Sequence, residues 1–235
     1  TLGPTMFNLF MNDLPNHVRY GRLYSYADDS QLEHCAKPDE LSHLKRQIET
    51  DLSQMSQWFH SNGLKVNPAK TEFLLAGTPT NTAKTSNLTV NFGGVPLKHS
   101  ESIKILGIHF DSHLNWEQHV SSVARKCNSS IISIRKLHLP RDVTKMLIQS
   151  LVFPIITYCL PAWAPKTVGM RKRIEKVLNF AIRTVTGLRK FDHVSRARSD
   201  LDWLTFAEMI DLRDMQRLHH VLRNSAASQL LRSLV

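Results

Sequence analysis

Two adjacent carboxylates, Asp28 and Asp29, have the clearest capacity for metal chemistry in this 235-residue chain. They follow Tyr26 and Ala27, and mixed apolar and polar flanks over residues 23–32 predict a tight β-hairpin with both acids at its tip. Magnesium binds through one or two carboxylates together with water and substrate phosphates, so an Asp pair on a rigid turn suits nucleotidyl transfer. Aspartate is also a favoured turn residue, and a solvated turn is the simpler explanation of these four residues taken alone.

A short helix is predicted before this hairpin and a longer helix after it. Apolar residues recur at helical spacing over residues 5–14, and we expect Pro15 to close this helix. The longer helix is expected to begin at a cap provided by Asp39 and to end at Asn62-Gly63. Its core-facing apolar stripe consists of Leu41, Leu44, Ile48, Leu52, Met55 and Phe59.

Strands and loops are predicted after the longer helix. Residues 64–75 indicate a turn followed by a strand, and the polar residues 77–87 indicate a surface loop. A hairpin is expected over residues 88–97, because Gly93-Gly94 separates two short apolar runs. A further strand is expected over residues 103–110. The first half of the chain therefore has the pattern of a mixed helix and sheet structure.

The pattern becomes helical from Trp116 onward. Apolar residues from Val120 to Ile134 mark a long amphipathic helix that Leu139-Pro140 ends. Residues 147–163 are mostly apolar but interrupted by prolines, which predicts a buried hairpin or a broken helix. Further helices are expected over residues 141–153, 168–186 and 205–223.

Helix end signals support this assignment. Gly187 is expected to end the helix over residues 168–186, because glycine readily takes the left-handed conformation found after helix C-termini. Thr205 and Glu208 have the spacing of a capping box at the start of the last helix. The two adjacent histidines His219 and His220 are expected on a polar helix surface. With a sheet-containing first half and a helical second half, the expected fold class is α+β.

The charge of the chain is unevenly distributed. The formal net charge is +10. Residues 1–119 contain ten Lys and Arg against twelve Asp and Glu, which gives −2, whereas residues 120–235 contain twenty against eight, which gives +12. A basic second half favours a polyanionic partner, with nucleic acid as the first candidate and an anionic membrane surface as the weaker alternative.

Cysteine usage and hydropathy indicate the compartment. Cys35, Cys127 and Cys159 are odd in number and far apart, which favours a reducing compartment, and we expect them to pack as small apolar groups. No apolar run is long enough for a membrane span, and the first residues do not resemble a signal peptide. We expect an intracellular protein, in the nucleus or cytoplasm, that is not secreted. Because the chain starts at Thr1 without Met, we also expect a fragment that lacks an N-terminal portion.

Four motifs in this order resemble those of non-LTR (LINE-type) retrotransposon reverse transcriptases. They are LGPTMFNLFMNDLP at residues 2–15, YADD at 26–29, GLKVNPAKTE at 63–72 and LGIHFD at 106–111. A single motif is a weak match, whereas four in the right order are specific. The resemblance implies the C-terminal part of a polymerase palm, in which a catalytic hairpin and a helix pack on an antiparallel sheet. It assigns the palm to residues 1–112, a thumb-like helical segment to 113–140 and a basic helical region to 141–235.

The same resemblance implies roles for single residues near the acid pair. Asp28 and Asp29 match the catalytic carboxylates that bind two Mg²⁺ ions, for which Mn²⁺ is an alternative. Tyr26 and Ala27 match residues that position the primer end. Lys70 matches a lysine near the leaving phosphates, where an ammonium group stabilises charge or donates a proton. A solvated loop lysine is the better explanation of a lone Lys, and in the context of residues 67–72 the two explanations of Lys70 are about equally good.

The resemblance also implies nucleic-acid contacts and substrates. Leu106 and Gly107 lie in the motif that matches the primer grip, although a core strand would have the same pattern. The implied partners are an RNA template, a DNA primer and dNTPs, without a membrane. Basic residues on helices are often only solvated, but the net charge of the second half favours contact with the phosphate backbone. The candidate residues are Arg125, Lys126, Arg135, Lys136, Arg171, Lys172, Arg173 and Lys176.

Part of the family pattern is missing from these residues. The family has a further catalytic Asp and a fingers region upstream of the segment at residues 2–15, and a Gln-Gly dipeptide is expected just before it. We therefore expect an RNA-directed DNA polymerase of which this chain is one part, inactive in isolation. The alternative is a decayed or co-opted retroelement remnant that binds nucleic acid or protein without catalysis.

Overall fold

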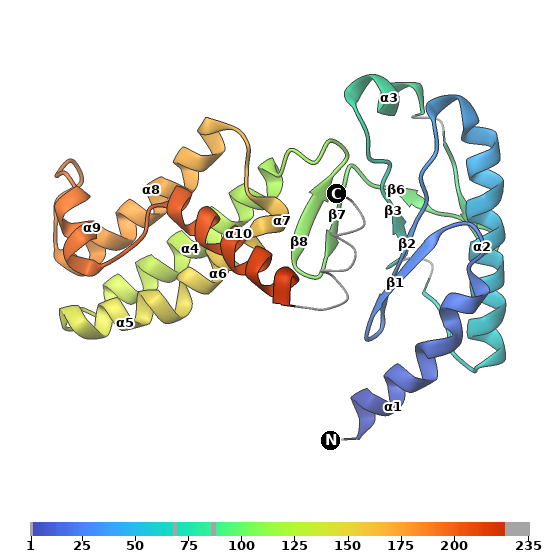
Figure 1. The fold of residues 1–235 in the computed structure, drawn as a ribbon, viewed down its shortest axis with the longest axis horizontal. Coiled ribbons are helices and arrows are strands. Elements are labelled where there is room, and N and C mark those ends of the chain that lie inside the picture. Colours follow the sequence, from blue (N-terminus) through green and yellow to red (C-terminus); the bar gives the residue numbers. More distant parts are fainter. Residues whose placement is uncertain (1, 68–69, 86–87, 224–235) are drawn as a thin grey trace. The chain divides into compact units, whose positions relative to one another are not determined.

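The computed structural model describes residues 2–67, 70–85 and 88–223. The chain divides into two compact units, residues 1–114 and 115–235, which are described separately below (Figure 1). Within the described residues, the first unit contains short helices, one long helix and four two-stranded sheets, and the second unit is helical. This composition agrees with the expected α+β class.

The first unit starts with helices and continues with alternating short strands and helices. Three of its strand pairs are antiparallel, and the pair β3–β6 is parallel. The helices are α1 (Gly3–Phe10), the 3₁₀ helix Met11–His17, the 3₁₀ helix Pro38–Glu40, α2 (Leu41–Ser61) and α3 (Pro79–Lys84). The strands are β1 (Arg22–Tyr26), β2 (Asp29–Glu33), β3 (Glu72–Phe73), β4 (Asn91–Phe92), β5 (Val95–Pro96), β6 (Lys98–His99), β7 (Ser102–Ile105) and β8 (Ile108–Asp111).

The β1–β2 hairpin packs beside α2 (Figure 1). Leu23 of β1 and Leu32 of β2 are cross-strand partners, and both pack against a buried cluster that includes Met55 and Trp58 of α2. Burial of apolar surface contributes about 25 cal/mol per Å², so this contact stabilises the hairpin on the core. Trp58 is further fixed by its indole N–H, which donates to a carboxylate oxygen of Asp13 at 3.2 Å.

The second unit consists of helices that surround a shared apolar core. The helices α4 and α8 pack side by side (Figure 1), and Trp163 is fully buried among them, with its indole N–H donating to the Tyr158 carbonyl at 2.8 Å. None of the described helices is long and apolar enough to cross a membrane. The elements are α4 (Glu117–Lys136), α5 (Arg141–Leu151), α6 (Phe153–Thr157), α7 (Leu160–Trp163), α8 (Val168–Thr186), α9 (Ser195–Leu201) and α10 (Phe206–Arg223).

The helical second half confirms most of the sequence predictions made for it. The apolar segment over residues 147–163 is a broken helix, divided between the end of α5, α6 and α7. Gly187 ends α8 with φ of +74°. Thr205 and Glu208 form the expected reciprocal capping box, with the Thr205 N–H donating to Glu208 and the Glu208 N–H to the Thr205 hydroxyl. The helix α9 was not predicted.

Several predictions for the first unit are wrong at the level of single elements. Pro15 does not close the first helix, because the chain continues as a 3₁₀ helix to His17. Pro15 lies inside this 3₁₀ helix, where it lacks a backbone N–H donor but keeps its carbonyl acceptor. Asp39 does not cap α2, because a 3₁₀ turn starts earlier, at Pro38. The predicted loop over residues 77–87 contains α3, which Thr78 caps. The predicted strand over residues 103–110 is the β7–β8 hairpin.

The cysteines differ from the expectation of uniform burial. Cys127 is buried, whereas Cys35 and Cys159 are exposed, and all three are free thiols. Burial raises the pKa of the Cys127 thiol to about 12, because the charged thiolate would lose its hydration. Only Cys127 therefore behaves as a small apolar core residue.

Some predictions lie outside the described residues or stay predictions. Residues 68–69, 86–87 and 224–235, which belong to the predicted turn, loop and C-terminal region, are not among the described residues. The described residues on either side of position 140 belong to one compact helical unit. The assignment of residues 1–112, 113–140 and 141–235 to a palm, a thumb-like segment and a basic region stays a prediction.

Candidate active site

The acid pair lies at the tip of the β1–β2 hairpin, as predicted. Tyr26 and Asp29 are the last cross-strand partners, so Ala27 and Asp28 form a two-residue turn. Ala27 has φ of +52°, a left-handed conformation that residues other than glycine rarely adopt. Such strain costs of order 1–3 kcal/mol and concentrates at functional sites. The turn therefore has an unusual conformation at the residue that directly precedes the two acids.

Both carboxylates are accessible. Asp28 and Asp29 are exposed, and among the described residues neither side chain has a hydrogen bond or an ion pair. Tyr26 is 68% exposed, so its ring is also open to a partner on one face of the hairpin. The tip thus presents two anionic groups and an aromatic ring from four consecutive residues.

The acid pair fits a divalent metal ion only as part of a larger ligand set. Among the described residues, no group of three or more His, Cys, Asp or Glu side chains has a metal-binding arrangement. Carboxylate oxygens are the ligands that Mg²⁺ prefers, and Mg²⁺ commonly takes one or two of them with water and phosphate oxygens. Asp28 and Asp29 can therefore hold such an ion together with ligands from substrate or from other residues.

Lys70 is not joined to the acid pair. Its side chain is exposed, and in the described part of the chain no hydrogen bond or ion pair links it to Asp28 or Asp29. Its backbone N–H, shortly before β3, donates to the Asn67 carbonyl at 3.1 Å. The predicted catalytic role of Lys70 stays a prediction.

Leu106 and Gly107 form the turn between β7 and β8 and do not lie within a continuous strand. Both have positive φ, +45° and +90°, as in the type I′ turns that form the two-residue loops of hairpins. Leu106 is 41% exposed. The predicted primer-positioning residues thus lie at a second exposed hairpin turn of the first unit.

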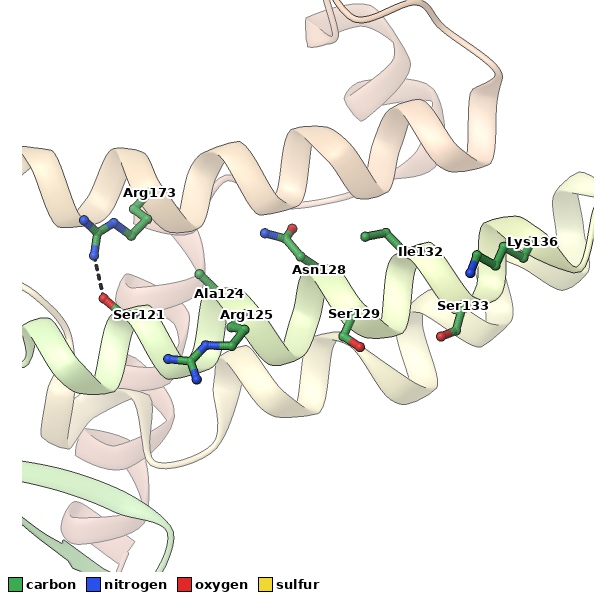
Figure 2. A pocket seen from close by; sticks show the side chains of 9 residues that line it. All are labelled: Ser121, Ala124, Arg125, Asn128, Ser129, Ile132, Ser133, Lys136 and Arg173. Carbon is green, nitrogen blue, oxygen red and sulfur yellow. Dashed lines mark hydrogen bonds between the residues drawn. The ribbon is translucent and has the colours of Figure 1, made fainter.

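A basic groove between α4 and α8 brings together part of the predicted nucleic-acid set. It is open, has a volume of about 760 Å³, and includes Arg125 and Lys136 of α4 and Arg173 of α8. Figure 2 shows Arg173 reaching across to Ser121, to which its guanidinium donates at 2.7 Å. An adjoining groove of about 390 Å³ includes Lys176. Among the described residues, no carboxylate lines either groove.

The other predicted basic residues are exposed but lie outside these grooves. They are Lys126, Arg135, Arg171 and Lys172. Arg171 also has a structural contact, since its Nε donates to the Pro165 carbonyl at 2.8 Å in the segment before α8. The structure therefore separates the predicted set into four groove residues and four others.

Asp51 is a residue near the hairpin that sequence analysis missed. It is fully buried on α2 and accepts hydrogen bonds from the segments at both ends of the hairpin. The signal was present in the sequence, because Asp51 occupies a position on the apolar face of the helix, between Ile48 and Met55. An acid at such a position is rarely tolerated unless it is paired.

Comparisons with known proteins indicate the family that the chain resembles. Residues 1–110 match the family described as reverse transcriptase (RNA-dependent DNA polymerase). The chain is similar to three Drosophila melanogaster proteins: a probable RNA-directed DNA polymerase from transposon BS, one from mobile element jockey and a probable one from transposon X-element. Identities are 27%, 20% and 25%, over 93%, 79% and 99% of this chain.

These relatives are much longer than the present chain. The alignments cover 26%, 21% and 26% of their lengths, so the chain spans about a quarter of the curated relatives that it matches. No solved structure matches the chain. The family match contains the Asp28-Asp29 hairpin, and the relatives extend the similarity into the helical unit. Residues 1–110 therefore match the reverse transcriptase family, and the chain as a whole is similar to RNA-directed DNA polymerases of transposons.

Proposed function

We propose that the β1–β2 hairpin supplies two carboxylates of the active site of an RNA-directed DNA polymerase, which adds dNTPs to a DNA primer on an RNA template. The observation that carries this proposal is the exposed pair Asp28 and Asp29, which has no side-chain partner among the described residues, at a strained two-residue turn inside the segment that matches reverse transcriptases. Two adjacent acids without protein partners are a poor arrangement for stability and a suitable one for divalent cations.

The residues of the tip have distinct proposed roles. Asp28 and Asp29 would hold Mg²⁺, or Mn²⁺ in its place, through their carboxylate oxygens. When bound, such ions favour the ionised primer 3′ hydroxyl and stabilise the charge of the leaving pyrophosphate. Tyr26 and Ala27 support the primer end, and Lys70 stabilises negative charge on the leaving phosphates.

We further propose that the grooves between α4 and α8 contact a nucleic-acid backbone. The described residues that line them include four cations and no carboxylate: Arg125, Lys136, Arg173 and Lys176. Polar side chains of α4, including Asn128, add hydrogen-bond donors (Figure 2). A phosphate chain needs such spaced positive charges and donors, and the resulting affinity is independent of sequence and decreases with salt.

Nucleotide incorporation tests the catalytic proposal. The longest polypeptide encoded by the reading frame that contains these residues is assayed with a primed RNA template, dNTPs and Mg²⁺. Asp28→Asn and Asp29→Asn should each reduce incorporation by at least about 100-fold, because each removes a charged metal ligand. Asp39→Asn is the matched control, since Asp39 is an exposed acid away from the tip. Incorporation that survives both tip substitutions would refute the proposal, whereas no incorporation by the unsubstituted polypeptide would favour the non-catalytic remnant.

Salt-dependent binding tests the groove. The four groove cations are replaced by alanine together, and affinity for a primed RNA is measured by fluorescence anisotropy at several salt concentrations. We expect weaker binding and a slope of log affinity against log salt that is smaller by about 3 to 4, since each lost phosphate contact lowers it by about 0.9. The control replaces four other exposed cations of the second unit by alanine: Lys166, Arg189, Lys190 and Arg196. Equal losses in both variants would refute a specific role of the groove.

A further inference from the structure

The side chain of Asp51, on α2, is a fully buried carboxylate. It accepts hydrogen bonds from the backbone N–H groups of Arg19, Tyr20 and Gly21, with nitrogen to oxygen distances from 2.8 to 3.3 Å. His34 Nε2 lies 3.0 Å from its Oδ2. Burying a carboxylate is costly unless its oxygens are satisfied, and these partners satisfy both of them.

The partners of Asp51 lie at the two ends of the β1–β2 hairpin. Arg19, Tyr20 and Gly21 directly precede β1, and His34 directly follows β2. One side chain of α2 thus ties the strand that enters the hairpin to the strand that leaves it. The junction is also tightly packed, because a Cβ at Gly21 would lie 2.6 Å from His34 Cε1 and 2.8 Å from the backbone carbonyl oxygen of Glu33.

The outer half of the hairpin has little other support. Leu23 and Leu32 are half-buried on the core, whereas all residues from Tyr24 to Ser30 are exposed. A two-stranded hairpin on its own is marginally stable in water, so its base must set the direction of its tip. The stretch from Gly21 to the tip is about 23 Å long at roughly 3.3 Å per residue, so a rotation of about 3° at the base moves the acids by about 1 Å.

We infer that Asp51 is a positioning residue for the catalytic hairpin: it holds both ends of the hairpin on α2 and thereby places Asp28 and Asp29. This inference rests on the proposed polymerase function and deepens it. Because Asp51 is fully buried and both of its oxygens accept from protein groups, it acts on the hairpin and not as a ligand. Its effect on catalysis is transmitted through β1 and β2, and misplacement of reacting groups by about 1 Å can reduce a rate about 100-fold.

Hydrogen exchange tests the clamp without any need for activity. In the 235-residue protein, Asp51→Asn replaces one acceptor oxygen by an N–H₂ group that faces N–H donors. We expect faster exchange, by at least about 10-fold, at the amides of residues 19–26 and 29–34, while exchange in the second unit is unchanged. Asp39→Asn, which removes a nearby charge outside the clamp, should leave exchange in both segments unchanged. Unchanged protection in folded Asp51→Asn would overturn the inference.

Steady-state kinetics test the link to catalysis in the longest encoded polypeptide. Asp51→Asn should lower kcat for incorporation about 10- to 100-fold, with KM for dNTP and affinity for primed RNA nearly unchanged. Val90→Ala truncates a buried side chain of the same unit and is the control for general destabilisation. If both variants are folded at the assay temperature and lose kcat equally, Asp51 is merely structural and the inference fails.

Two variants of His34 keep the test decisive if Asp51→Asn does not fold. His34→Ala removes one donor to the carboxylate and should lower kcat in the same way but less strongly. His34→Gln retains a side-chain N–H and should recover most of that loss, whereas equal activity of the two would overturn the inference. Asp28→Asn is the reference: if it leaves incorporation intact, the proposed function fails, and the exchange result still decides whether Asp51 holds the hairpin.

Discussion

The left-handed turn residue Ala27 offers a quantitative test of strain at the candidate site. Ala27 has φ of +52°, and this region costs an L-residue roughly 1–2 kcal/mol relative to glycine. Ala27→Gly removes that cost, but the greater freedom of glycine in the unfolded chain opposes it by about 0.4–1 kcal/mol. We therefore expect a net stabilisation of the β1–β2 hairpin of about 0.8 kcal/mol, from the middle values of these two ranges.

The assay is native-state hydrogen exchange at the hairpin amides, which reports the local free energy of opening. The matched control is Ala36→Gly, since Ala36 is also exposed and outside helices and strands but does not have positive φ. In this control the free energy of opening should only fall, by about 0.4–1 kcal/mol, because glycine has greater freedom in the unfolded chain. Equal changes in the two variants would refute strain at Ala27. Because the glycine turn is also less restricted, we expect slower nucleotide incorporation despite the gain in stability.

Three further predictions concern the helical unit. Glu175→Gln should lower the free energy of unfolding of the helical unit, measured in urea, by about 1–2 kcal/mol. The Glu175 carboxylate accepts hydrogen bonds from the Arg198 guanidinium and from a backbone N–H of α10. Hydrogen bonds from Thr205 lower the pKa of Glu208 below its usual 4.5, so its contribution to stability is complete above pH 4.5 and is lost as the pH falls through the lowered pKa. In a plot of melting temperature against pH, Glu208→Gln should therefore reduce the fall in melting temperature at acid pH. An unchanged plot would contradict this. Cys127 should react with a thiol reagent only after unfolding, while the two exposed cysteines react in the native protein, which mass spectrometry can follow.

The parts of the fold that local chemistry determines were predictable. The hairpin over residues 23–32 follows from alternating side chains around a two-residue turn, and α4, α8 and α10 follow from apolar periodicity with a glycine end or a capping box. The same logic failed where two signals competed. The glycine in Leu106-Gly107 was interpreted as a strand residue within an apolar run, although it marks a turn at which both residues have positive φ.

The support of the acid pair was not predictable from local patterns, because it depends on contacts between distant residues. Asp51 lies 30 to 32 positions after the backbone groups that it binds, and nothing in the spacing of Arg19, Tyr20 and Gly21 reveals a carboxylate partner. An acid on the apolar face of a helix does indicate that some buried donor must exist. It does not indicate which donor, so only the fold identifies the hairpin as the element that Asp51 holds.

The basic grooves show the same limit for binding. A net charge of +12 in residues 120–235 predicts an anionic partner but does not distinguish cations that act together from cations that are merely solvated. The packing of α4 against α8 makes this distinction, because it places Arg125 and Lys136 on the same open groove as Arg173, more than 30 positions later in the chain. Affinity for a phosphate chain depends on cations at several neighbouring positions. Removing the four groove cations should therefore weaken binding more than removing four exposed cations elsewhere on the second unit, and this difference separates a binding surface from a generally basic protein.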